Sequence, residues 1–388
     1  MKKIAHLFPW FHANGVAIYV FEVIRNMKNF SHEIITGERP IHYPPMPQHM
    51  KNIKIRQLTP FSLSYSPTPF QTRFSLRLRE LSEPFLLYLR LQNLRKIAKD
   101  YDLIVYHSID YRLIEVKNLR YFHSYIKKML KILNDDKHIG TPKLYTDHSL
   151  LACDFEGTYV PEISIGIFKN SIIMGRNSIE KAKKWSKQQG YKRNIWHIPN
   201  SVDTQKFYWK PLPEKKKLVL GMAGRLGARG DLVFKLLNKK IDFIDLHIAV
   251  FGSQGDINDL RKRCGSHVTF YQNIPYDQMP QFYQDIDILL NPLPLQTNDR
   301  VIIESMSCGR PVIRVGRLDY FPVIDRANGF VIENNIDSLI QLLSDIHNNR
   351  RLIEDLGKNA RALIERELSD DVIMPKLEKV YEKVMSTG

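Results

Sequence analysis

Two segments within residues 285–313 decide the fold: Asp285-Ile-Asp-Ile-Leu-Leu-Asn-Pro292 and, after a polar loop, Val301-Ile-Ile-Glu-Ser-Met-Ser-Cys-Gly-Arg-Pro-Val-Ile313. The apolar run 286–290, closed by Asn-Pro, predicts a buried parallel strand. Residues 301–308 predict a helix that ends at Gly309, and Pro311 then begins the next strand. A strand, a polar loop and a helix in this order place backbone amides and the positive helix end at the carboxyl edge of a parallel sheet. Open α/β sheets bind anionic ligands there.

Glu304 lies about one turn into this predicted helix. Its carboxylate can accept hydrogen bonds from two neighbouring hydroxyls, such as those of a ribose. The stretch resembles the donor-binding segment of retaining glycosyltransferases of family 4, which have the GT-B fold. That family carries a Glu, seven residues and a second Glu, followed by Gly-x-Pro-Val. The second Glu corresponds to Glu304, and Gly309 to Val312 match the Gly-x-Pro-Val.

The loop before Glu304 departs from the family pattern. Gln296 stands in place of the first Glu, and Thr297 and Asp299 stand in place of two glycines. The resemblance implies that Gln296, Thr297, Asn298 and Asp299 line the sugar pocket. Because Gln296 removes a carboxylate that would face the sugar, the identity of the sugar stays open.

The length of 388 residues favours two domains, since a single core rarely grows to this size. The resemblance implies two Rossmann-like α/β domains that face a central cleft. Residues 1–205 are expected to form an acceptor-binding domain, to which a C-terminal helix over residues 370–388 crosses back. Residues 206–369 are expected to form the nucleotide-sugar donor domain.

Two motifs of the expected first domain match the family. A strand over residues 4–8 precedes a loop with Asn14 and Gly15, where the family has a Gly-Gly turn near the donor phosphates. The resemblance implies that the Gly15 amide approaches the phosphates. Thr146-Asp-His148-Ser resembles a family turn whose histidine contacts the donor sugar, which assigns this contact to His148.

The expected second domain begins with a strand that runs into the glycine-rich loop Gly224-Arg-Leu-Gly-Ala-Arg229. Small residues let the backbone approach a phosphate, and two cations four residues apart can clamp a diphosphate. The resemblance implies that Arg225 and Arg229 stabilise charge on the leaving diphosphate, with Gly224 beside them. A later strand leads to Asn273 and Ile274, which are expected to contact the base.

No metal site or cofactor is expected. Asp285-Ile-Asp287 has the Asp-x-Asp spacing of a metal motif, but it opens an apolar strand and is interpreted as a chance match. The three cysteines, Cys153, Cys264 and Cys308, are widely spaced, which favours a reducing cytoplasm over a disulfide framework. No apolar run reaches the roughly 18–20 residues that a membrane span requires.

The net charge of +16 is concentrated in one half of the chain. Residues 1–200 contain 31 lysines and arginines against 16 acidic residues, whereas the remaining residues contain 26 against 25. Within the basic half, residues 70–99 alternate cations with aromatic and aliphatic residues, the pattern of a helix at an anionic membrane surface. The alternative for such a segment is a solvated helix that covers the sheet.

The sequence thus predicts a metal-independent glycosyltransferase of the hexosyltransferase type. It is expected to move a sugar from a nucleotide-sugar donor to a lipid-linked or cell-surface glycan in polysaccharide biosynthesis. The expected location is the cytoplasm, peripheral to the inner face of the membrane, with no nucleic acid as partner. Two alternatives stay open: a nucleotide-sugar 2-epimerase of the same fold, and a non-catalytic basic protein that binds polyanions.

Overall fold

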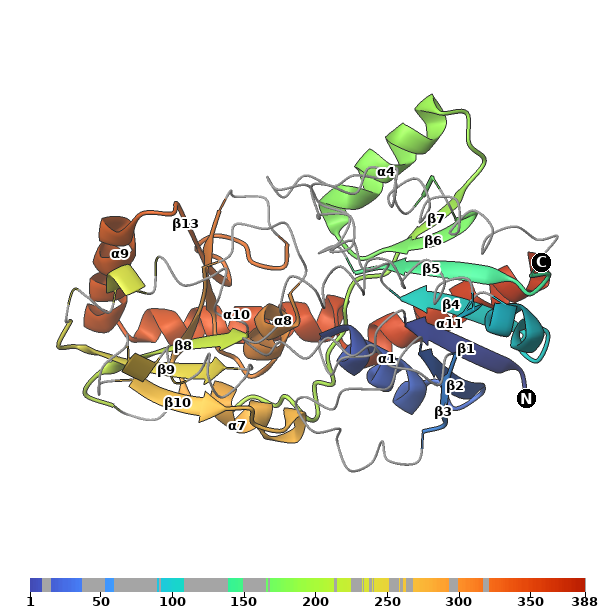
Figure 1. The fold of residues 1–388 in the computed structure, drawn as a ribbon. Coiled ribbons are helices and arrows are strands. Elements are labelled where there is room, and N and C mark those ends of the chain that lie inside the picture. Colours follow the sequence, from blue (N-terminus) through green and yellow to red (C-terminus); the bar gives the residue numbers. More distant parts are fainter. Residues whose placement is uncertain are drawn as a thin grey trace, which may run out of the picture. The chain divides into compact units, whose positions relative to one another are not determined.

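The chain forms two compact units (Figure 1). The first unit comprises Met1–Tyr43, Gln48–Ile198 and Pro375–Gly388, and the second comprises Pro44–Pro47 and Pro199–Met374. The computed structural model describes residues 1–8, 15–36, 53–58, 89–90, 92–107, 139–148, 165–166, 168–212, 215–224, 232, 234–236, 239, 241–250, 258, 261–262, 268–292, 299–316 and 321–387.

The first unit contains a fully parallel sheet in the order β3-β2-β1-β4-β5-β6-β7. This order reverses direction between β1 and β4, which makes that place the switch point of the sheet. The strands are β1 (Lys3–Phe8), β2 (Ser31–Thr36), β3 (Ile55–Gln57), β4 (Leu103–His107), β5 (Lys143–Asp147), β6 (Asn170–Ile173) and β7 (Asn194–His197).

The central strands β4 and β5 of this sheet are buried on both faces, as is usual in a parallel sheet. Ala5 and Leu7 of β1 pack into a cluster with residues of β2, β4 and β5 on one face. Because successive side chains of a strand point to opposite faces, His6 lies on the other face. On that face, Tyr19 of α1 (Gly15–Asn26) contacts His107, the last residue of β4. Tyr381 near the C-terminus contacts Phe30, which follows α1.

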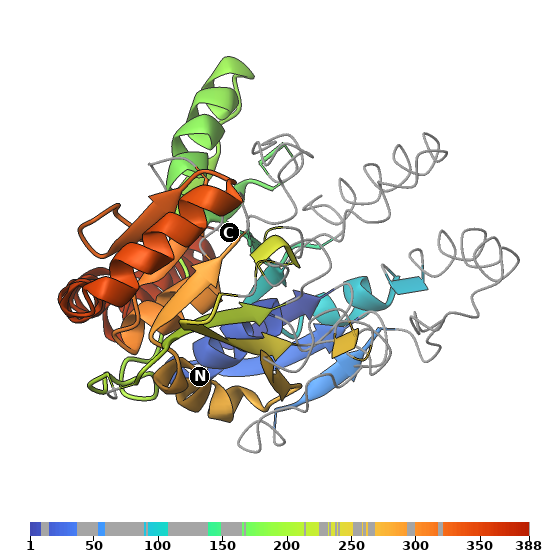
Figure 2. The ribbon, with the colours of Figure 1, turned by 90° about the vertical axis from the view of Figure 1, so that its left-hand side faces the viewer.

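A further helix of the first unit, α4 (Arg176–Gln188), packs on β6 and β7 through Ile179 and Ala182. The rest of its length extends away from these strands (Figure 1, Figure 2). Its exposed side is strongly basic, with Lys181, Lys183 and Lys187 among the exposed residues.

The second unit contains a parallel sheet in the order β10-β9-β8-β11-β12-β13, with its switch point between β8 and β11. The strands are β8 (Leu218–Gly224), β9 (Ile244–Val250), β10 (Val268–Gln272), β11 (Ile288–Asn291), β12 (Val312–Val315) and β13 (Gly329–Ile332). Alternate residues of β8, β9 and β11 form a buried aliphatic core with Leu339 and Leu343.

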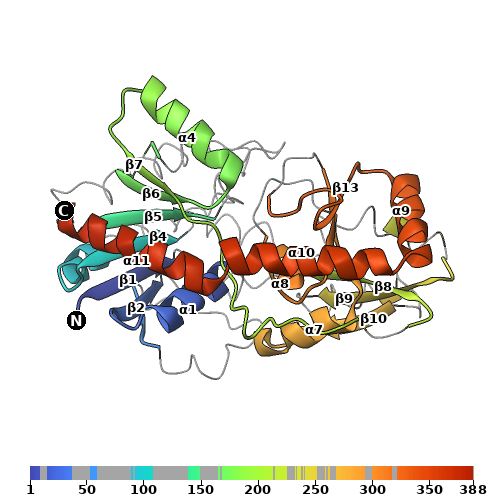
Figure 3. The ribbon, with the colours of Figure 1, turned by 180° about the vertical axis from the view of Figure 1, so that it is seen from behind.

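The helices of the second unit follow from the periodicity of their apolar residues. α8 lies between the sheet and α10, and Figure 3 shows α10 running alongside it. The elements are the 3-10 helix η4 (Tyr276–Gln278), α7 (Met279–Asp285), α8 (Arg300–Ser307), α9 (Ile336–Asn348), α10 (Arg351–Glu367) and the beginning of α11 (Asp370–Thr387). α9 and α10 are separate helices, divided after Asn348.

The described parts of the deciding stretch form the predicted strand, helix and strand as β11, α8 and β12, with boundaries shifted by one or two residues. The predicted helix end at Gly309 is confirmed, because this residue has a φ of 71°. A side chain there would also collide with the Trp209 ring, since an added Cβ would lie 2.1 Å from its Cδ1 atom. Both the dihedral angle and the close packing therefore require glycine.

Candidate functional site

Three residues predicted for donor binding, Gly224, Asn273 and Ile274, lie at the carboxyl edge of the second sheet. Gly224 ends β8 with a φ of 110°, and Asn273 follows β10 with a φ of 45°. Asn273 donates its backbone N–H to the Val250 carbonyl at 2.9 Å, which holds the turn after β10 against the end of β9. Ile274 follows in the same turn and is partly buried.

Asp299 occupies the N-cap position of α8. Its Oδ2 atom accepts a hydrogen bond of 3.1 Å from the side-chain amide of Asn291, the last residue of β11. This bond joins the end of the strand to the start of the helix, so the helix N-terminus opens at the carboxyl edge beside the switch point. A helix end in this position favours an anionic group.

Glu304 lies in the second turn of α8 and is 3% exposed. The Tyr276 hydroxyl donates to its Oε1 atom and the Tyr283 hydroxyl to its Oε2 atom, each at 2.9 Å. The Arg300 Nε atom, one turn earlier in α8, donates to Oε1 at 3.2 Å. The buried carboxylate thus has three donors, which offsets the cost of removing its charge from water.

Arg300 links this cluster to the segment before the second sheet. Its guanidinium donates to the Tyr276 hydroxyl at 2.7 Å and to the Ser201 carbonyl at 3.4 Å. Burial and the neighbouring Glu304 raise the pKa of Tyr283 well above its usual value. Tyr283 therefore remains a hydroxyl donor at physiological pH, and the cluster keeps its hydrogen-bond pattern.

Tyr276, Tyr283, Arg300 and Asn291 were not identified as site residues from the sequence. The spacing of four between Arg300 and Glu304 on one helix was an available signal, because such residues share a helix face. The tyrosines gave no local signal, since they come from the segment between β10 and β11 and meet Glu304 only after the chain folds.

Two of the residues predicted at the first sheet, Gly15 and His148, are described; they follow β1 and β5, and β4 lies between these strands in the sheet. Gly15 is exposed and begins α1. His148 follows β5, and its Nε2 atom lies 3.2 Å from Nδ1 of His107, the last residue of β4. The Tyr19 ring packs edge-on against the His148 ring, with centroids 5.0 Å apart.

Several predicted residues lie outside the described part of the chain. These are Asn14, Arg225, Arg229, Gln296, Thr297 and Asn298, together with most of the basic segment 70–99. Their roles stay predictions.

The Asp-x-Asp pair carries hydrogen bonds within the second unit. Asp287 accepts the Val219 backbone N–H and an Arg350 guanidinium N–H, both at 2.8 Å, while Asp285 accepts the Tyr271 hydroxyl at 2.9 Å. These bonds fix the start of β11 to β8.

Across the described residues, no group of three or more His, Cys, Asp or Glu side chains is placed to hold a metal ion. None of the helices that the structure describes is long and apolar enough to span a bilayer.

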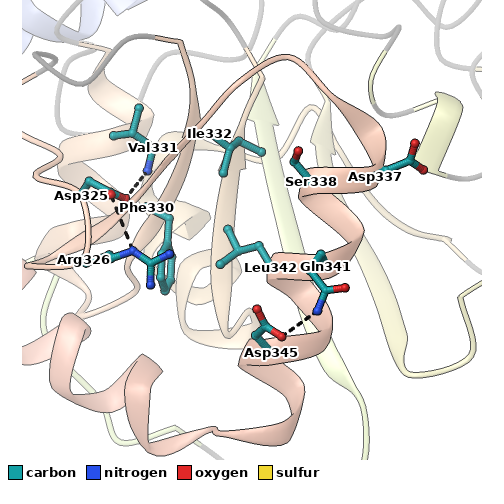
Figure 4. Close-up of a pocket in the computed structure, with 10 residues that line it drawn as sticks. All are labelled: Asp325, Arg326, Phe330, Val331, Ile332, Asp337, Ser338, Gln341, Leu342 and Asp345. Carbon is teal, nitrogen blue, oxygen red and sulfur yellow. Dashed lines mark hydrogen bonds and ion pairs between the residues drawn. The ribbon is translucent and has the colours of Figure 1, made fainter.

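A polar hollow lies between β13 and α9 (Figure 4). It holds three carboxylates, and each already has a partner: Asp325 accepts the Val331 backbone N–H at 2.9 Å, Asp345 accepts from Gln341 at 2.9 Å, and Asp337 pairs with Lys239 at 3.7 Å. β13 is an edge strand, two strands from β11. The hollow is thus separate from the switch point between β8 and β11.

The comparisons with known proteins agree with the fold. Residues 219–349 match the family model described as glycosyl transferases group 1. The chain is 30% identical over 122 residues to an uncharacterized glycosyltransferase of Methanocaldococcus jannaschii, which covers 31% of this chain and 34% of that protein. It is 26% identical over 216 residues to the sulfoquinovosyl transferase of Arabidopsis thaliana, covering 54% and 41%. The chain thus matches less than half the length of each of these two relatives.

Solved structures match along the whole chain at low identity. Sucrose-phosphate synthase from Thermosynechococcus elongatus aligns over 100% of both chains with a TM-score of 0.71 and 17% identity. HepE of Anabaena, solved with UDP-glucose, aligns over 99% of this chain and 100% of its own with a TM-score of 0.68 and 15% identity. The predicted fold is confirmed: the chain has the GT-B fold, with two parallel-sheet α/β domains.

Proposed function

We propose that the chain is a retaining glycosyltransferase of family 4 that transfers a sugar from a nucleotide-sugar donor to an acceptor hydroxyl. The proposal depends above all on Glu304, which lies in the segment 219–349 that matches the glycosyltransferase model. Its Oε2 atom accepts one described bond, from Tyr283, whereas Oε1 accepts two. Because each carboxylate oxygen has two lone pairs, Oε2 retains an acceptor position for a ribose hydroxyl.

The donor diphosphate would lie across the switch point of the second sheet. The N-terminus of α8 supplies a favourable field for its charge, and Arg225 and Arg229 follow Gly224 in the sequence. Developing charge on a leaving diphosphate is the main electrostatic demand of this reaction class. His148 and Gly15 would contact the donor from the first unit, and no metal is required.

We further propose a lipid-linked or cell-surface glycan as acceptor, and a cytoplasmic location at the inner face of an anionic membrane. The excess charge of residues 1–200 lies outside residues 206–369, the part proposed to hold the donor diphosphate. In the described part of that half, α4 presents the exposed residues Lys181, Lys183, Lys184 and Lys187. Trp185 and the 44% exposed Tyr191 lie beside them, a combination suited to a lipid surface.

Thermal unfolding with a panel of nucleotide sugars tests the donor assignment. UDP-glucose is the first to try, since HepE was solved with it. A donor at 100 times its Kd stabilises the folded state by about 2.7 kcal/mol. The proposal fails if neither a nucleotide sugar nor a nucleoside diphosphate raises the Tm. Conversion of the stabilising donor to an isomer without any acceptor would instead indicate a 2-epimerase.

A further inference from the structure

Four histidines of the first unit form a diagonal line across one face of its sheet. His32 is in β2, His6 in β1 and His107 in β4, and His148 follows β5. The parallel register places each histidine one strand over and two residues nearer the carboxyl edge than the one before. Residues two apart in a strand share a face, so the four rings lie on the same side.

The rings are joined nitrogen to nitrogen. His32 Nδ1 lies 2.9 Å from His6 Nε2, His6 Nδ1 lies 3.0 Å from His107 Nε2, and His107 Nδ1 lies 3.2 Å from His148 Nε2. At the inner end, His32 Nε2 lies 2.9 Å from the Met27 carbonyl oxygen. Every contact is within hydrogen-bond distance, and the histidine chain runs without a break from Met27 to the carboxyl edge.

The inner rings are shielded from water. His6 is 0% and His107 1% exposed, and burial lowers the pKa of both well below the usual value of 6.5. Burial also lowers the pKa of His32. These rings are therefore neutral at pH 7 and above, and each carries a single N–H.

The Met27 carbonyl sets the direction of every bond in the histidine chain. A carbonyl oxygen only accepts, so the N–H of His32 must be on Nε2 and its Nδ1 must accept from His6. The same reasoning passes from His6 to His107 and from His107 to His148. The reverse direction would place the Nε2 lone pair of His32 against the carbonyl oxygen at 2.9 Å. One arrangement therefore satisfies all four bonds.

We propose that His32, His6 and His107 are positioning residues that hold His148 as the Nε2–H tautomer, so that its Nδ1 atom is a hydrogen-bond acceptor. A group that contacts Nδ1 must then donate, as a hydroxyl does. The histidine chain stands on its own geometry, and only the identity of that group, a hydroxyl of the donor sugar, rests on the proposed function. The bond between His32 and the Met27 carbonyl would thus determine, through His6 and His107, that His148 accepts a hydrogen bond from a sugar hydroxyl.

The experiment is long-range ¹H–¹⁵N correlation spectroscopy of the ligand-free, ¹⁵N-histidine-labelled protein at pH 7.5. The nitrogen shifts of each ring distinguish its two neutral tautomers, and assignment uses single histidine substitutions. We expect the Nε2–H tautomer at all four positions. A Nδ1–H tautomer at His148, or rapid exchange between tautomers there, overturns the proposal.

A break in the middle of the histidine chain tests the coupling. His6→Phe keeps a buried ring but removes both nitrogens, so the N–H of His107 loses its acceptor and the direction toward His148 is no longer fixed. We expect the single-tautomer signal of His148 to be lost, although residue 6 does not contact it. His197→Phe is the matched control, a partly buried histidine in β7 of the same sheet, and should leave His148 unchanged.

If His6→Phe does not fold, His32→Phe removes the ring that contacts the carbonyl, at a less buried position. An unchanged His148 tautomer in a folded His6 or His32 variant contradicts the proposal. Addition of UDP-glucose separates this inference from the proposed function. Failure of UDP-glucose to shift the His148 signals, with all four tautomers as expected, counts against the donor assignment and leaves the histidine chain standing.

Discussion

The Tyr283 hydroxyl donates a hydrogen bond to Oε2 of Glu304 at 2.9 Å, between two side chains that are 0% and 3% exposed. The tyrosine comes from α7 and the carboxylate from α8, so the bond joins the helices before and after β11. In the proposed function, this bond orients the carboxylate that receives the ribose. The cluster thereby links the stability of the second unit to donor binding.

Tyr283→Phe should lower the free energy of unfolding by about 1–3 kcal/mol, because the buried Oε2 atom loses its described protein donor. Denaturant unfolding measures the change. Tyr271→Phe is the control, since that hydroxyl donates at 2.9 Å to the less buried Asp285, and a smaller loss is expected there. Bound UDP should recover part of the loss in Tyr283→Phe if a ribose hydroxyl replaces the missing donor.

Glu304→Gln should weaken nucleoside diphosphate binding and also destabilise the second unit by about 1–3 kcal/mol. The amide replaces one acceptor oxygen with an NH₂ group, which then faces a tyrosine hydroxyl or the Arg300 guanidinium. Calorimetric titration with UDP and a thermal melt separate the two effects. Wild-type affinity for UDP in a folded Glu304→Gln protein would remove Glu304 from the donor site.

Arg225→Ala should reduce donor binding or turnover by roughly 2–4 kcal/mol, the scale for loss of a buried charge-assisted contact to a diphosphate. Arg326→Ala serves as the control, because that side chain is 82% exposed and belongs to the same unit. Steady-state kinetics measure the change in turnover, and UDP titration measures the change in binding affinity. Equal losses in both variants would mean that net charge, and not a specific contact, is responsible.

Acidification should destabilise the first unit. The pKa values of His6 and His107 are lower in the folded protein than the usual 6.5, so the unfolded chain binds more protons below that pH. Stability is therefore full above about pH 6.5 and falls as the pH drops, by about 1.4 kcal/mol per pH unit for each ring that stays neutral. Urea unfolding between pH 8 and 5 measures this slope. His6→Phe should reduce the slope by about 1.4 kcal/mol per pH unit, the contribution of one ring.

Removal of the basic face of α4 should weaken binding to anionic vesicles. Replacing Lys181, Lys184 and Lys187 with Gln removes about 3 kcal/mol of attraction, or roughly 100-fold in partitioning, at about 1 kcal/mol per cation. Sedimentation with anionic and neutral vesicles at moderate salt measures it.

The same number of exposed lysines elsewhere provides the control, Lys358, Lys379 and Lys383. A similar loss in this control set would show that total charge decides vesicle binding. Equal partitioning of the wild type to anionic and neutral vesicles would contradict the membrane proposal altogether.

The sequence by itself determined the alternation of strands and helices and the strand–loop–helix unit that carries Glu304. Gly309 and the strand β11 were predicted because their signals are local: a left-handed C′ glycine and a short apolar run. The GT-B fold followed from a resemblance between short motifs in the right order. None of these inferences required knowledge of which strands pair.

Only the tertiary structure decided what surrounds the site. Tyr276 and Tyr283 lie 28 and 21 residues from Glu304, and no periodicity connects them. The histidines are separated by 26, 101 and 41 positions, and they form one line because β1 lies between β2 and β4 in the sheet. Strand order and register are set by packing of the whole sheet. A contact that depends on both therefore cannot be predicted from a local stretch of sequence.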